Sequence, residues 1–90
     1  MLTTKIIHQT GRIDQVVRDY FAEHLEEKEV PAKDLMERFI AKGTFTKDYD
    51  RPGLPIRNVL RKLDATGQLS LLKHCKVVRH AVNRNWYFER

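Results

Sequence analysis

The sequence predicts an α+β fold in which a three-helix body is followed by a β-hairpin. Three stretches in the first two-thirds of the chain carry apolar residues at steps of three and four, which is typical of amphipathic helices. After Gly67 the apolar residues alternate with polar ones, which is typical of strands. With 90 residues, of which 41% are hydrophobic and 32% charged, the chain is expected to form one domain around one core.

The first helix is expected to begin at Gly11 and to end near Lys28. Residues 1–10 show neither a helical nor an alternating apolar pattern, so they are predicted to form an N-terminal arm before a domain of residues 11–90. Asp14 and Arg18 are four residues apart and are expected to pair on the outer face of this helix. Its apolar stripe consists of Ile13, Val16, Val17, Tyr20, Phe21 and Leu25.

A second helix is predicted from Pro31 to Lys42. Proline is favoured at the first position of a helix, and Gly43 follows as a natural left-handed stop. A polar loop of residues 44–53 comes next, and its Pro52-Gly53 pair is a strong turn signal. The aromatic residues Phe45 and Tyr49 are expected to pin this loop to the body, and stacking on a ligand is the alternative.

The third helix is predicted to start at Pro55 and to close at Gly67. Its inner stripe consists of Ile56, Val59, Leu60 and Leu63. At 100° per residue, Asn58, Arg61 and Ala65 lie nearly opposite this stripe, and Arg57 and Lys62 lie on its flanks. The outward face is therefore basic, with an amide among the cations.

Two strands are predicted at Leu69–Leu72 and at Trp86–Phe88, paired as a hairpin. Trp86 and Phe88 share one strand face and are expected to fill the core. Residues 73–85 connect the strands, with further pairing possible around Val77. This connection carries four cations, two histidines and no acidic residue, so it is expected to project positive charge.

The positive charge is concentrated in the second half of the chain. Residues 1–45 contain seven basic and eight acidic residues, a net charge of −1, whereas residues 46–90 contain ten and four, a net charge of +6. Such asymmetry indicates a polyanionic partner. The alternative is a solvated cationic face that keeps a small domain soluble.

The order of elements, with a basic third helix that closes at Gly67, resembles a winged helix-turn-helix domain. The resemblance spans roughly residues 11–89 and is carried mainly by residues 54–69. It implies that the third helix lies in the major groove of DNA and that the connection between the strands forms a wing on the backbone or in the minor groove. On this basis Asn58 and Arg61 are expected to face bases. The backbone contacts would be made by Arg57, Lys62, Lys76, Arg79 and Arg84.

The expected function is therefore duplex DNA binding, of a transcriptional or a phage or plasmid regulatory kind, with a homodimer as an option. A protein-interaction adaptor that docks an acidic partner in a larger complex is the first alternative, because charge alone allows it equally. RNA binding is another, although the aromatic residues do not form an exposed stacking sheet.

Other chemistry finds little support in the sequence. Cys75 is the single cysteine, so we expect no disulfide and a reducing, cytoplasmic setting. His74, Cys75 and His80 lack a fourth ligand at a suitable spacing, so no metal or other cofactor is expected, although Cys75 beside basic residues could have a lowered pKa. No phosphate loop or nucleophile motif is present, and no apolar run reaches 18 residues, so we expect neither an enzyme nor a membrane span.

Overall fold

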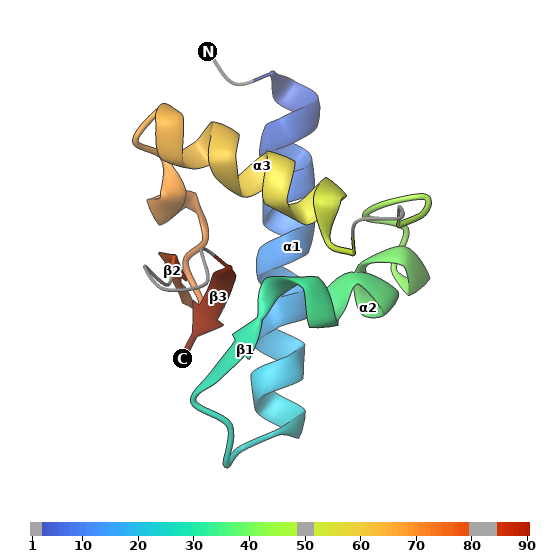
Figure 1. Cartoon of the computed structure of the whole chain (residues 1–90), viewed down its shortest axis with the longest axis vertical. Coiled ribbons are helices and arrows are strands. Elements are labelled where there is room, and N and C mark those ends of the chain that lie inside the picture. Colours follow the sequence, from blue (N-terminus) through green and yellow to red (C-terminus); the bar gives the residue numbers. More distant parts are fainter. Residues whose placement is uncertain (1–2, 49–51, 80–84) are drawn as a thin grey trace.

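The computed structural model describes residues 3–48, 52–79 and 85–90, and these residues form an α+β fold (Figure 1). They contain three α-helices, two short 3-10 helices and a three-stranded antiparallel sheet. The long helix α1 is crossed by α3 near its N-terminal end, and the strands lie to one side of both (Figure 1). The elements in chain order are α1 (Thr4–Glu23), β1 (Glu29–Pro31), η1 (Ala32–Leu35), α2 (Met36–Ala41), α3 (Leu54–Ala65), η2 (Leu69–Leu71), β2 (Lys76–Arg79) and β3 (Trp86–Glu89).

Helix α1 begins seven residues earlier than its apolar pattern predicts. The Thr3 side chain caps the helix by accepting a hydrogen bond from the Ile6 amide at 3.2 Å. Residues 4–10, expected to form an arm, are therefore the first turns of α1. Thr10 occupies the inner stripe, buried, with its hydroxyl donating to the Ile6 carbonyl at 2.7 Å. The end was also predicted wrongly: α1 stops at Glu23, and Leu25 is 76% exposed rather than in the core.

The second predicted helix is divided into three elements. Pro31 ends strand β1 instead of starting a helix, and it lies at an edge of the sheet, where a proline removes no ladder hydrogen bond that the strand needs. The chain then turns through η1 into α2. Helix α2 ends at Ala41, and Gly43, two residues later, has a left-handed φ of 75°. The left-handed stop at Gly43 is thus confirmed, and β1 is an element that the sequence did not predict.

The sheet has the order β1-β3-β2, with β3 in the centre. Phe88 of β3 is opposite Val30 on one side and Val77 on the other, so the pairing expected around Val77 is confirmed. The strand predicted at Leu69–Leu72 is wrong. That segment contains η2, because the amides of Leu71 and Leu72 donate to the nearby carbonyls of Gln68 and Leu69 and so take part in no ladder.

The core lies between the sheet and the helices. Phe88 and Phe39 are fully buried with ring centroids 6.4 Å apart, and Trp86 is buried beside Phe88 on the same strand, as predicted. Phe45 packs edge-on against Phe39 at 5.8 Å, so the expected pinning of the loop is confirmed for this residue. Tyr49 lies outside the described residues. Helix α3 was predicted closely, since Leu54–Ala65 buries Ile56, Val59, Leu60 and Leu63.

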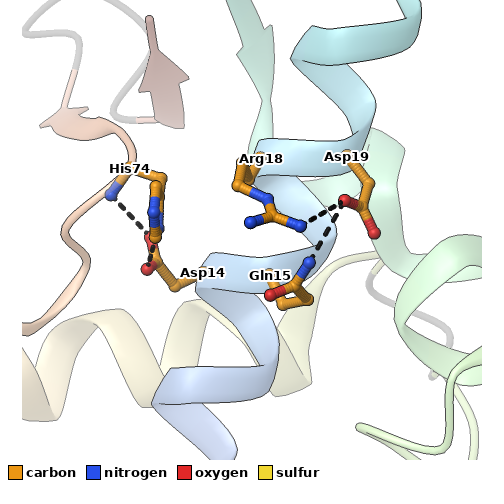
Figure 2. Close-up of polar contacts among 5 residues, drawn as sticks. All are labelled: Asp14, Gln15, Arg18, Asp19 and His74. Atoms are coloured by element: carbon orange, nitrogen blue, oxygen red, sulfur yellow. Dashed lines mark hydrogen bonds and ion pairs between the residues drawn. The ribbon is translucent and has the colours of Figure 1, made fainter.

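Asp14 joins α1 to the segment that leads into β2 (Figure 2). Its carboxylate is buried, accepts the His74 amide at 2.8 Å through Oδ1 and lies 2.6 Å from His74 Nδ1 through Oδ2. The predicted pair with Arg18 is therefore wrong. Arg18 contacts Asp19 at 3.4 Å on the exposed side, where Gln15 also donates to Asp19. Asp14 faces the interior and contacts a residue that lies sixty positions later in the sequence.

None of the helices within the described part of the chain is both long enough and apolar enough to cross a membrane.

Replacing Asp14 by alanine should destabilise the fold by about 1 to 3 kcal/mol, because the His74 amide and ring lose a charged acceptor. Chemical denaturation followed by circular dichroism measures this loss. Arg18→Ala is the matched control on the same helix, and its exposed ion pair predicts a change within about 0.5 kcal/mol. Equal losses for the two variants would show that Asp14 does not anchor His74.

Candidate nucleic-acid interface

Helix α3 presents the polar face that its sequence pattern predicts. Its buried stripe faces the core, and Asn58, Arg61 and Lys62 are exposed, while Arg57 is half-buried. Asn58 and Arg61 are one turn apart and therefore share a side of the helix. An exposed amide and guanidinium at this spacing have the geometry to reach the edges of bases in a groove.

The start of α3 packs directly against η1. Gly53 precedes the helix with a left-handed φ of 83°, and its amide donates to both carboxylate oxygens of Asp48 at 3.0 and 3.2 Å. A Cβ atom added to Gly53 would lie only 2.5 Å from the Cβ of Lys33. Glycine is required here both for its backbone conformation and for the close approach of Lys33.

A depression joins the start of α3 to the start of β3. Arg57 from α3 and Lys33 from η1 line it together with Asn85 and Trp86. The remaining lining residues are Ala32, Pro52, Gly53 and Ile56. Among the described lining residues there are two cations and no carboxylate. Helix and sheet therefore meet at a positively charged surface.

Arg79 extends this surface onto β2. It lies directly opposite Trp86 in the β2–β3 ladder, and its guanidinium sits 5.5 Å from the centre of the Trp86 indole. Trp86 thus contacts a cation of the sheet and lines the same depression as a cation of α3. Side chains alternate along a strand, so Lys76, three residues before Arg79, belongs to the other face of the sheet, where its ladder partner is Glu89.

The seven predicted interface residues therefore separate into groups. Arg57 and Arg79 converge on Trp86, and Asn58, Arg61 and Lys62 lie exposed along α3. Lys76 is not brought to this group, and Arg84 lies outside the described residues. Lys33 is the residue that sequence reasoning missed. Its position after Pro31 placed it in a predicted helix within the acidic half of the chain, and only the contact with Gly53 brings it to the basic surface.

The pKa of the Cys75 thiol is raised, not lowered as its basic neighbours in the sequence suggested. Burial and, to a smaller extent, the negative charge of Asp14 together raise the pKa of the Cys75 thiol from 9.0 to about 12. The neighbouring His74 ring is engaged with Asp14. His80, the third residue of the considered metal cluster, lies outside the described residues, and no group of three or more metal-binding side chains occurs within the described ones.

Comparison of the chain with protein-family models, with curated proteins and with solved structures finds no match.

Gly53→Ala should destabilise the protein more than Gly43→Ala, by at least about 1 kcal/mol in the free energy of unfolding. Both glycines have a positive φ, so both variants pay a similar backbone strain. Only the alanine at position 53 also meets Lys33, whereas a Cβ at Gly43 has no neighbour within 4 Å. Urea titrations compare the two variants. Equal costs would contradict the close packing of η1 on α3.

The Cys75 thiol should react with a disulfide reagent at pH 8 at least about ten times more slowly in the folded protein than in the urea-unfolded chain. The thiolate is the attacking species, and a pKa near 12 keeps it scarce at this pH. Because the folded-state pKa is the higher one, the associated stability is present below about pH 9 and is lost as the pH rises toward 12. Equal reaction rates would contradict a raised pKa.

Proposed function

We propose that this chain is a winged-helix-like domain that binds duplex DNA, with α3 in the major groove and the β2–β3 pair against the backbone. The α+β arrangement and the sheet order β1-β3-β2 are compatible with a winged helix. The observation that carries the proposal is the convergence of Arg57 and Arg79 on Trp86, which places cations of the helix and of the sheet on one surface. Cations in such an arrangement favour a polyanion that spans both elements.

The position of Arg57 in α3 is unfavourable for the helix itself, and it therefore favours an anionic partner. Arg57 is the fourth residue of α3, close to the end where the helix dipole is positive and disfavours a cation. Lys62 lies in the last turn, where the dipole favours it, so its presence needs no ligand. A phosphate near the start of α3 would compensate the cost at Arg57.

In this proposal the residues divide the work between affinity and selectivity. Arg57, Arg79 and Lys33 contact phosphates and supply most of the affinity, which is independent of sequence. Asn58 and Arg61 face base edges, where each two-pronged hydrogen bond discriminates between bases. Lys62 flanks these two residues and contacts the backbone. A domain of this size has a small footprint, so two copies or a larger assembly would increase its selectivity.

The domain should bind a random-sequence duplex with an affinity that falls steeply with salt. Four described cations are assigned to phosphates, Lys33, Arg57, Lys62 and Arg79, and they predict a slope of about −3.5 for log affinity against log salt. The double variant Arg57→Ala/Arg79→Ala should make the slope less steep by about 2, because two phosphate contacts are lost. Fluorescence anisotropy of a labelled duplex at several salt concentrations measures both slopes.

Lys28→Ala is the matched control, because Lys28 is exposed in the turn between α1 and β1, and that turn lies at the opposite end of the molecule from α3 (Figure 1). This variant should bind the duplex with the wild-type slope. A wild-type protein that does not bind duplex DNA at low salt would defeat the proposal and favour an acidic protein partner. A double variant with an unchanged slope would defeat the assignment of the interface.

A further inference from the structure

Arg90, the residue after β3, closes the C-terminal end of α1 with its side chain. Its Nη2 donates to the carbonyl oxygens of Phe21 and His24, both at 2.8 Å, and its Nε donates to the Glu27 carbonyl at 3.0 Å. The backbone amide of Arg90 also donates to the Lys28 carbonyl at 2.9 Å. A single residue of the sheet therefore binds the end of α1 and the turn that leads into β1.

Helix α1 has no cation of its own at this end. Its last turn contains no basic residue but does contain Glu23, which pairs with Arg38 of α2. Glu26 and Glu27 follow in the turn to β1. The last carbonyls of a helix lack intrahelical donors and carry partial negative charge, so a nearby carboxylate is unfavourable and a cation is favourable. The guanidinium group of Arg90 supplies both the cation and the donors.

Like charges oppose the pairing of β1 with β3 beside Arg90. The ladder places Glu29 of β1 directly opposite Glu89 of β3, and Lys76 of β2 lies opposite Glu89 on the other side. Two carboxylates that face each other across neighbouring strands destabilise the pairing. The bond from the Arg90 amide to the Lys28 carbonyl lies next to this pair. Arg90 thus holds together the end of the sheet that the two carboxylates separate.

The contacts of Arg90 lie at the surface, where they can open without disturbing the core. Arg90 is exposed, and its guanidinium group lies 5.1 Å from the centre of the buried Phe21 ring. In the turn of residues 24–28, His24 is half-buried and the other residues are exposed. A segment with few buried contacts opens locally at a lower free energy than the whole domain.

We propose that Arg90 is a latch on the segment of residues 24–29, which opens and closes as a unit while the rest of the domain stays folded. In the closed state the Arg90 side chain binds the carbonyls at the end of α1. In the open state these bonds are broken, the end of α1 frays, and Glu29 separates from Glu89. The end of the central strand β3 then presents unpaired backbone groups on that side.

The latch does not rest on the function proposed above. The turn between α1 and β1 lies at the opposite end of the molecule from α3 (Figure 1). The contact of Asp14 with His74, which holds the entry into β2, lies outside the opening segment. Opening of the latch therefore leaves the basic residues of α3 and β2 in place.

Arg90→Ala tests the latch, because it removes the guanidinium group and keeps the backbone amide. The amides of His24 and Glu27, which donate to carbonyls at the end of α1 and in the turn, should exchange with solvent at least about tenfold faster, as expected when hydrogen bonds from a charged donor are lost. The amides of Leu60 and Leu63, in the buried stripe of α3, should keep their wild-type rates. Hydrogen exchange followed in ¹⁵N–¹H spectra measures both sets.

Arg90→Lys separates the hydrogen bonds from the charge. Lysine keeps the cation near the end of α1 but lacks the planar fork of donors that reaches several carbonyls at once. Exchange at His24 and Glu27 should therefore stay several-fold faster than in the wild type. Arg18→Ala is the matched control, since it removes an exposed guanidinium group from the same helix and should change neither set of amides.

Three results would overturn the latch. Unchanged exchange at His24 and Glu27 in Arg90→Ala would show that the side chain does not hold the turn. Equal acceleration at Leu60 and Leu63, or an unfolded variant, would show that Arg90 stabilises the whole domain and not a local segment. Full protection in Arg90→Lys would assign the effect to charge alone. A wild-type protein that fails to bind duplex DNA defeats only the proposed function, because exchange is measured on the free protein.

Discussion

The position of β3 in the centre of the sheet is the constraint on which the arrangement of this protein depends. Its residue Phe88 is fully buried, lies opposite Val30 and Val77 in the two neighbouring strands and meets the ring of Phe39 from α2. A two-stranded hairpin alone is marginally stable in water. Pairing with β1 and burial of the Phe88 face make the β2–β3 pair a part of the body. The basic residues on this pair therefore have a defined position relative to α3.

Trp86 links the position of β3 to the position of the charged surface. The same alternation that buries Phe88 also directs Trp86 inward, so its indole lies between the start of α3 and the end of β2. The stacking of Arg79 on the indole is worth about 0.5 to 1 kcal/mol at an exposed site, which is small beside the attraction between a guanidinium group and a phosphate. The contact therefore orients Arg79 without making it unavailable to a polyanion.

The parts that the sequence predicted are those in which a single local pattern decides the structure. The stripe of α3, with Pro55 at its start and Gly67 beyond its end, defines that helix almost to the residue. Strand β1 is three residues long, which is too short to show an alternating pattern. The first turns of α1 were not predicted because polar Thr10 lies in the buried stripe and interrupts its apolar pattern. The cations of the interface could be named from the sequence, but the convergence of Arg57 with Arg79 depends on Trp86, and Lys33 reaches the surface only because Gly53 lacks a side chain.

The entry into β2 is held by contacts with the core and with α1. Leu72 is buried, and two residues later the amide and ring of His74 are bound by the Asp14 carboxylate on α1. Cys75 follows with a thiol whose raised pKa keeps it neutral, so it adds no second charge beside Asp14. These successive anchors fix where β2 starts, and the ladder with β3 then fixes where Arg79 ends. The site of the basic surface on the sheet is thus determined by a buried acid of α1, which explains how a half-chain with a net charge of −1 takes part in positioning the cations of the other half.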